Sequence, residues 1–216
     1  MALSAYYAFD SPSPLIDAGP NMMNATVVGN FSSINSRRNQ AILFNTTNSY
    51  VYAAGFTVFS TTNQPFSIAM WIKPIMLNGT LLQVTKSGTV NSGWCTPFVG
   101  FSLNGSIVVQ TYDQQNTLPS IIGPIITPNT WLYIVETFSQ GNGLRLYLNG
   151  SLYQTRSVSS YYGSGTGANY VIIGSNLGGN CYSGDISMGQ YRGAIDELRI
   201  YSRELSATDV AILSNW

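Results

Sequence analysis

Apolar and polar residues alternate over short runs along most of this chain, and turn-forming residues separate the runs. A period of two is typical of β-strands with one buried and one exposed face. Short strands at regular spacing, divided by Gly, Pro and Asn, are typical of antiparallel sandwiches. The pattern therefore predicts an all-β fold with strands over residues 4–9, 25–28, 40–44, 66–73, 81–85, 98–103, 107–112, 131–138, 144–148, 151–158, 171–173 and 194–201.

Asn-Gly pairs mark three of the tightest connections between these strands. They occur at Asn78-Gly79, Asn104-Gly105 and Asn149-Gly150, and this dipeptide favours a two-residue hairpin turn. One helix is predicted, at residues 206–213. Ser206 is suited to begin it, because Asp209 stands three positions later and can complete a capping box.

The last predicted strand carries two adjacent acidic residues, Asp196 and Glu197. Strict alternation places Asp196 on the same side as Leu198 and Ile200, which is the apolar side, and Glu197 on the opposite side. A carboxylate on an apolar face is costly unless it is paired, hydrogen-bonded or bound to a cation. We therefore expect Asp196 to have a specific partner.

The segment 191–206, YRGAIDELRIYSRELS, closely resembles the "G-x-I-D-E-x-R-I-Y-x-R-x-L-S" signature that ends laminin G-like, concanavalin A-like jelly-roll domains. Residues 66–74 resemble that family's "F-T-I-S-x-W-V-K-P". Residues 130–138 with 144–150 resemble its "W-H-H-V-A-x-T-Y…L-x-L-Y-V-D-G", and residues 7–10 with 17–21 its "Y-x-F-D…D-x-S-G-N". The resemblance implies one domain over residues 1–216, a two-sheet antiparallel jelly roll with one short C-terminal helix.

Charged residues make up only 8% of the chain, with nine basic and nine acidic side chains. This balance excludes the basic surface of a nucleic-acid-binding protein and a polybasic membrane contact. No apolar run is long enough to insert into a bilayer. A hydrophobic content of 44% nevertheless indicates a globular chain, whose surface is built from Ser, Thr, Asn, Gln and Tyr. Such a surface suits a secreted, extracellular protein.

The two cysteines, Cys95 and Cys181, allow one disulfide in an oxidising compartment. Closing so long a loop would stabilise the fold by about 4 kcal/mol. Two free, buried thiols are the alternative.

A disulfide would bring Trp94 close to Tyr182, and Tyr161-Tyr162 could join them as an aromatic platform for a sugar. The alternative is that these aromatic rings only cover the disulfide. The sequence thus predicts a ligand site at Trp94, Tyr161, Tyr162 and Tyr182 and leaves both interpretations open.

The family resemblance also implies a structural calcium ion where the N-terminal loops meet the terminal strand. The matching positions are Asp10, Asp17, Asn21 and Asp196, whose oxygen atoms suit Ca²⁺. The chain has no histidine and only two cysteines, which excludes zinc sites of the usual kind. The alternative is that Asp10 and Asp17 cap turns, and that backbone N–H groups or Arg192 hold Asp196.

Six N-x-S/T sequons are candidate glycosylation sites on a secreted protein. Three of them are Asn-Gly pairs, which a hairpin turn favours for local reasons alone. The six asparagines are Asn24, Asn30, Asn45, Asn78, Asn104 and Asn149.

The residues that catalysis would need are sparse. Without histidine, Ser-His and Cys-His nucleophiles are excluded, and Asp196 and Glu197 are predicted to point to opposite faces. We therefore expect a non-catalytic recognition or adhesion module that binds a glycan or an extracellular protein. The alternative is a self-assembling structural subunit of a matrix or filament. Its uncharged surface would not oppose association, and its N-terminal strand could pair with a neighbour's sheet.

Overall fold

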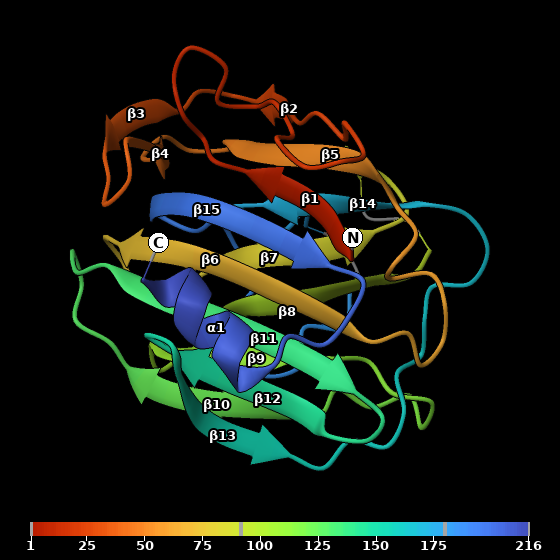
Figure 1. Ribbon diagram of the computed structural model, residues 1–216. Helices are drawn as coiled ribbons and strands as arrows, with labels where there is room; N and C mark the ends of the chain where they lie inside the picture. Colours follow the sequence, from red (N-terminus) through yellow and green to blue (C-terminus); the bar gives the residue numbers. More distant parts are fainter. Residues whose placement is uncertain (1, 91–92, 179–180, 216) are drawn as a thin grey trace.

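The computed structural model describes residues 2–90, 93–178 and 181–215. Within these ranges the chain forms fifteen strands and one helix (Figure 1). The elements are β1 (Leu3–Tyr7), β2 (Thr26–Val28), β3 (Ser32–Asn35), β4 (Gln40–Phe44), β5 (Tyr50–Phe56), β6 (Phe66–Pro74), β7 (Thr80–Thr85), β8 (Cys95–Phe101), β9 (Ser106–Gln110), β10 (Ser120–Ile125), β11 (Leu132–Ser139), β12 (Gly143–Leu148), β13 (Ser151–Arg156), β14 (Asn169–Ile173), β15 (Gly193–Tyr201) and α1 (Ala207–Ser214).

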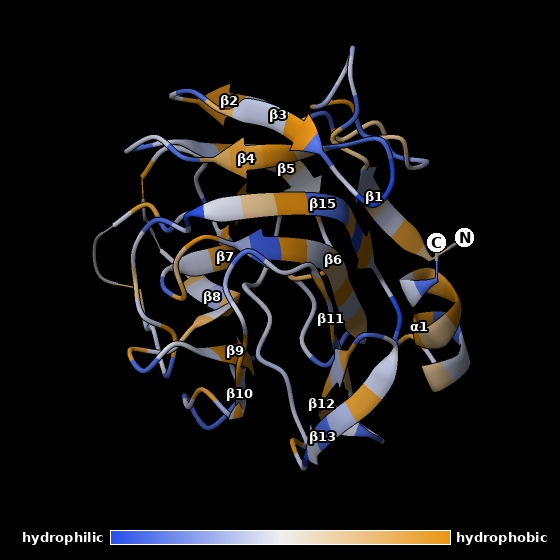
Figure 2. Ribbon diagram, turned by 90° about the vertical axis from the view of Figure 1, so that its left-hand side faces the viewer, coloured by the Kyte–Doolittle hydropathy of each residue, from blue (hydrophilic) through white to orange (hydrophobic). Residues whose placement is uncertain are grey.

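The strands form two antiparallel sheets, which confirms the predicted sandwich. Sheet A has the order β13-β12-β11-β6-β15-β4-β3, and β1 also pairs with β15. Sheet B has the order β10-β9-β8-β7-β14-β5-β2. In Figure 2 the two sheets form facing layers, and α1 lies outside sheet A.

Aromatic side chains fill the centre of the space between the sheets. Phe66 contributes a ring from sheet A and Phe98 one from sheet B, with centroids 5.4 Å apart. Phe59 and Tyr161 come from connections and contact the same two rings. Because each such ring buries a large apolar area, this cluster joins the two layers.

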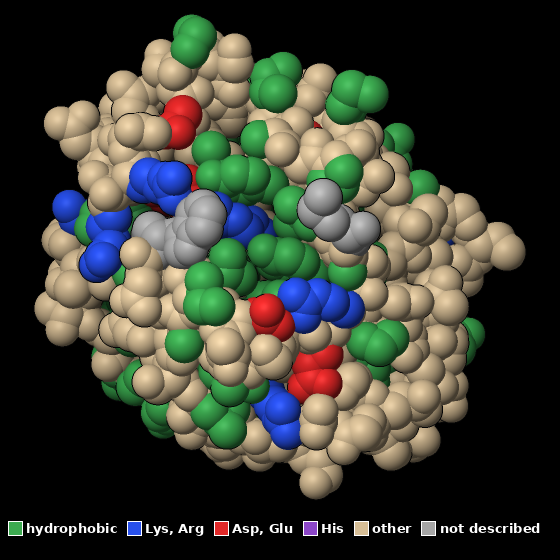
Figure 3. Space-filling view, in the orientation of Figure 1, with side chains coloured by type: hydrophobic (Ala, Val, Ile, Leu, Met, Phe, Trp, Pro, Cys, Tyr) green, Lys and Arg blue, Asp and Glu red, His purple; other side chains and the backbone are tan. Residues whose placement is uncertain are grey.

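A second, smaller apolar cluster lies on the outer face of sheet A, beneath α1. Trp71 and Tyr133 pack there with Leu205 and Val210. Figure 3 shows this face, with hydrophobic side chains at its centre beside both basic and acidic groups. The helix begins as predicted, since Ser206 and Asp209 form a capping box.

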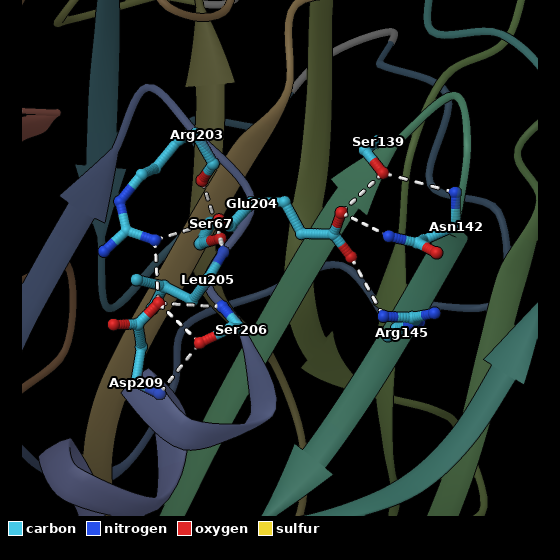
Figure 4. A network of polar contacts seen from close by, with 9 residues as sticks. All are labelled: Ser67, Ser139, Asn142, Arg145, Arg203, Glu204, Leu205, Ser206 and Asp209. Atoms are coloured by element: carbon cyan, nitrogen blue, oxygen red, sulfur yellow. Dashed lines mark hydrogen bonds and ion pairs between the residues drawn. The ribbon is translucent and has the colours of Figure 1, made fainter.

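Hydrogen bonds fix the connection from β15 to α1 on sheet A (Figure 4). Ser67 Oγ donates to the Arg203 carbonyl at 2.9 Å and accepts from Leu205 N at 2.9 Å. The Glu204 carboxylate accepts from Ser139 and Asn142 and forms an ion pair with Arg145 at 3.1 Å. These contacts make the C-terminal segment part of the sandwich surface.

Three strands were not predicted, namely β3, β5 and β10. The β10 segment contains Gly123-Pro124, which reads as a turn, yet an edge strand tolerates a proline. The N-terminal strand β1 pairs with β15 of its own chain, with Leu3 opposite Tyr201 and Tyr7 opposite Leu198. Its pairing with a neighbour's sheet stays a prediction.

A β-bulge in β15 corrects the predicted face of Asp196. Asp196 pairs with Trp71 and Arg199 with Ala69, so β15 has one extra residue relative to β6. Glu197 takes up the extra residue with a φ of 51°. The inner face therefore carries Ile195, Leu198 and Ile200, whereas Asp196 lies with Trp71 on the outer face.

Candidate ligand-binding site

The Cys95–Cys181 disulfide is present, as the first of the two alternatives predicted, with its Cα atoms 5.4 Å apart. It attaches the long connection between β14 and β15 to the outer face of sheet B. Beyond it, Gln110 Nε2 donates to the Ser183 carbonyl at 2.8 Å, and Ser187 N donates to the Phe101 carbonyl at 2.7 Å. The connection thus crosses the sheet with fixed contacts at both ends.

A hollow of about 290 Å³ opens beside this disulfide. Trp94, Tyr112 and Tyr182 provide its aromatic walls, and Gly93, Cys95 and Thr96 complete the lining. Tyr182 is 69% exposed, so most of its ring is available to a ligand. None of these lining residues carries a charge, which makes the hollow amphipathic but uncharged.

Tyr112 is the centre of the aromatic cluster. Its ring stacks with that of Tyr182 at 6.2 Å and meets those of Trp94 and Tyr162 edge-on at 6.3 and 6.0 Å. Burial raises the pKa of Tyr112, and the nearby Tyr182 and Tyr162 hydroxyls add to the effect. Its hydroxyl therefore stays a hydrogen-bond donor over the ordinary pH range, and it donates to Asn116 Oδ1 at 3.0 Å.

The turn after Tyr112 is held by a single carboxylate. Asp113 Oδ1 accepts from Gln115 N at 3.0 Å and Thr117 N at 2.8 Å, and Asp113 Oδ2 accepts from the Thr117 hydroxyl at 2.7 Å. An aspartate that binds the backbone two or more residues on fixes the turn locally. The loop that presents Tyr112 is thus held in place without a ligand.

The structure brings together three of the four predicted ligand-binding aromatics and corrects the fourth. Trp94, Tyr162 and Tyr182 gather around Tyr112, which the sequence predicts only as the end of a strand. Tyr161 is fully buried, and its hydroxyl donates to the Phe59 carbonyl at 2.7 Å. It belongs to the core because consecutive residues 161 and 162 point in opposite directions, one inward and one to the surface.

The four predicted calcium ligands make separate contacts. Asp17 accepts from the backbone N–H groups of Tyr6, Gly19 and Met23 at 2.7–2.9 Å, so its carboxylate is engaged by three backbone donors. Asp10 accepts from Gln40 N and Asn39 Nδ2, and Asn21 donates to the Ser4 carbonyl. Among the described residues no group of three or more His, Cys, Asp or Glu could hold a metal ion. The residues do not fit a shared coordination sphere, and calcium binding stays a prediction.

Asp196 is held by protein donors on the outer face of sheet A. Its Oδ2 accepts from the Ser36 hydroxyl and its Oδ1 from Glu197 N at 2.8 Å. Burial is the main cause that raises the pKa of Asp196 to about 7, and the neighbouring Glu197 and Asp10 carboxylates contribute. The alternative involving a backbone N–H group is thus the one observed, together with Ser36.

Glu197 forms a buried ion pair with Arg199 at 2.5 Å and accepts from the Tyr6 hydroxyl at 2.9 Å. The Arg199 guanidinium lies 4.1 Å from the Tyr6 ring centroid. Asp196 and Glu197 therefore share the outer face, contrary to the prediction, but both are buried. None of the four hollows described for this chain is lined by two carboxylates, the arrangement that glycoside hydrolysis requires.

All six sequon asparagines are exposed. Five of them, Asn30, Asn45, Asn78, Asn104 and Asn149, stand in turns at one end of the sandwich. Asn24 lies in the β1–β2 connection, where its Oδ1 accepts from Asp17 N at 3.0 Å. The aromatic hollow is at the opposite end, where β8 begins and β9 ends. Occupancy of the sequons stays a prediction.

No helix in the described ranges is both long and apolar enough to cross a membrane.

Among curated proteins, botulinum neurotoxin type F from Clostridium botulinum is 25% identical over 165 residues, which are 67% of this chain and 12% of the toxin. The chain thus matches only a small part of the toxin's length.

Solved structures with the same fold include binding domains. Domain 4 of AbnA, a GH43 extracellular arabinanase from Geobacillus stearothermophilus solved with arabinotriose, has a TM-score of 0.66 at 20% identity, covering 98% of both chains. The binding domain of Paraclostridial Mosquitocidal Protein 1 has a TM-score of 0.72 at 21% identity, covering 99% of this chain and 52% of that one. A family model described as the concanavalin A-like lectin/glucanases superfamily, of the laminin G type, matches residues 45–211. With so much of its length matched, and with the jelly-roll sandwich that the resemblance implied, the chain belongs to this superfamily.

Proposed function

We propose that this protein is a non-catalytic, extracellular binding module that holds a saccharide in the aromatic hollow. The observation that carries the proposal is the hollow itself, in which Trp94, Tyr112 and Tyr182 surround an uncharged space beside a disulfide. An aromatic ring offers a flat apolar surface to the C–H face of a sugar, while hydroxyl groups at its rim can exchange hydrogen bonds with sugar hydroxyls.

The aromatic residues of the hollow are already held in position, so a ligand can bind with little rearrangement of the site. The disulfide fixes the position of Tyr182 relative to Trp94, and the Asp113 turn fixes Tyr112. A site whose groups are already ordered loses less conformational entropy on binding. The arabinotriose complex of a domain with the same fold supports a saccharide ligand.

The test is a glycan-array screen of the natively produced protein, run once with calcium and once with chelator. We expect selective binding to neutral glycans that Tyr182→Ala weakens by up to about tenfold, because an aromatic contact contributes about 0.5–1.5 kcal/mol. Tyr153→Ala is the matched control, since Tyr153 is also an exposed tyrosine but lies on β13.

Equal binding by both variants would contradict the proposed site. Binding that disappears with chelator would instead support the calcium prediction. If no glycan on the array binds, the result would favour a protein ligand or the self-assembling structural subunit.

The alternative, a self-assembling structural subunit, is supported by one feature. All six residues of the edge strand β13 are exposed, and Leu152 and Tyr153 are among them. An exposed edge strand with apolar side chains is a template for pairing with another sheet.

A further inference from the structure

A second and larger hollow lies on sheet B, with a volume of about 550 Å³. One wall is the turn between β8 and β9, from Ser102 to Ser106, and another is β10 at Ile122. The third is the segment 183–188, which directly follows Tyr182 of the aromatic hollow. We call this space the 183–188 groove.

The wall formed by segment 183–188 is held to the sheet along its length. Asp185 N donates to Gln110 Oε1 at 3.2 Å, and Asp185 Oδ2 accepts from the Ser120 hydroxyl. Ile186 packs so closely on β8 that a Cβ at Gly100 would come 2.6 Å from its Cγ2 atom. The groove is therefore formed before any ligand binds.

The lining of the 183–188 groove combines hydroxyl groups, aliphatic surface and one carboxylate. Ser102, Ser106, Ser183 and Ser187 supply the hydroxyls. Leu103 is 90% exposed and Ile122 is 51% exposed, so both present apolar surface to solvent.

Asp185 is the only charged residue in this lining. Its Oδ2 is occupied by Ser120, whereas no donor among the described residues contacts its Oδ1. A carboxylate oxygen accepts strongly from ligand hydroxyls and repels a ligand acid. Aliphatic and hydroxyl surface around it match the two faces of a sugar ring.

We propose that the 183–188 groove is a second binding subsite, for a neutral saccharide, in which Asp185 accepts hydrogen bonds from sugar hydroxyls. The proposal extends the proposed function from one hollow to two but depends on different residues. Because segment 181–188 contributes to both spaces, the two subsites lie along one stretch of chain.

The experiment is chemical-shift mapping on ¹⁵N-labelled protein made without glycans, because Asn104 lines the groove and a glycan there would occupy it. The probes are maltotriose, cellotriose and arabinotriose, with glucuronic acid as the acidic comparison. We expect at least one neutral trisaccharide to shift the amides of Gly184, Asp185 and Asn104, and glucuronic acid to leave them unchanged.

Asp185→Asn keeps an acceptor for Ser120 but removes the charge, and we expect about a tenfold loss of affinity at the groove. Asp10→Asn, which removes a carboxylate at sheet A, is the control and should leave the affinity unchanged. Shifts that Asp185→Asn does not alter, or no shifts with any probe, would overturn the proposal. Shifts at these amides that grow with protein concentration alone would assign the groove to contact between copies and also overturn it.

The two sites fail separately in this design. Both proposals are supported if Asp185→Asn abolishes the chemical-shift changes at the groove and Tyr182→Ala weakens glycan binding on the array. Groove binding without any effect of Tyr182→Ala would leave this inference standing and contradict the aromatic hollow.

Discussion

Glu136 is a buried acid without a partner. It lies on β11 with its cross-strand neighbours Ile68 and Leu146, both of which face the core between the sheets. Neither carboxylate oxygen has a hydrogen-bond partner among the described residues. Burial raises the pKa of Glu136 well above its usual value, so the folded protein retains a proton that the unfolded chain loses.

This difference makes folding stability depend on pH. The unfolded carboxyl loses its proton near pH 4.3, whereas the folded one loses it only at a raised pKa. In that window the native state binds more protons, so stability falls as pH rises, by at most about 1.4 kcal/mol per pH unit. Glu136→Gln should remove this slope and raise the melting temperature at pH 8 more than at pH 4. Calorimetry at both values tests this, and equal shifts would contradict it.

Among the strands, β13 is the one most open to solvent, and it forms an edge of sheet A. One edge of β13 pairs antiparallel with β12, and the register of this pairing shifts between Leu146 and Tyr147. Its outer side offers backbone donors and acceptors to another chain, and Arg156 is its only charged residue. Few of the usual devices that protect edge strands are therefore present here.

The self-assembly alternative predicts that copies associate through β13. Leu152→Lys places a charge on the exposed strand and should abolish association while leaving the melting temperature within about 2 °C, because surface substitutions rarely change stability by more than about 0.5 kcal/mol. Sedimentation velocity over a range of protein concentrations measures the outcome. A single monomeric species in the unaltered protein at every concentration would exclude the alternative.

The sequence was informative about elements whose local pattern agrees with their packing. Residues 66–73 and 131–138 are rich in aromatic and β-branched residues, and both are central strands of sheet A. The face of Asp196 could not be predicted, because one extra residue in β15 reverses the alternation and only the pairing with β6 reveals it.

In the candidate site, the disulfide gave the positions of Trp94 and Tyr182, since a covalent bond limits their separation. The central role of Tyr112 depends on how four connections between strands meet in space. The spacing of these residues along the sequence does not predict that they come into contact. The same limit explains why Tyr161 and Tyr162 were placed together in the site, although only Tyr162 lies there.

At the scale of the whole molecule, one covalent bond joins two segments that are far apart in sequence beside the aromatic hollow. Cys95 begins β8 and Cys181 lies in the β14–β15 connection, 86 positions away in sequence. The bond therefore stabilises the fold by restricting the unfolded chain, and it also holds Tyr182 at the hollow.

Replacing both cysteines by alanine should lower the free energy of unfolding by about 4 kcal/mol, because the unfolded chain regains the freedom of a long loop. Urea denaturation measures this loss. We also expect the double variant to lose glycan binding at temperatures where it remains folded, since Tyr182 is no longer fixed. Unchanged binding by a folded double variant would show that the hollow does not need the bond.

The absence of charge among the residues that line the aromatic hollow also bears on the environments in which it can work. Dissolved ions weaken attraction between charged groups over distances of about 10 Å at 0.1 M salt, but they hardly affect stacking on an aromatic ring. Long-range electrostatic attraction would not speed the association of a ligand with this hollow, and a high salt concentration would not release it. Fresh water, tissue fluid and sea water would therefore be nearly equivalent surroundings for binding at this hollow.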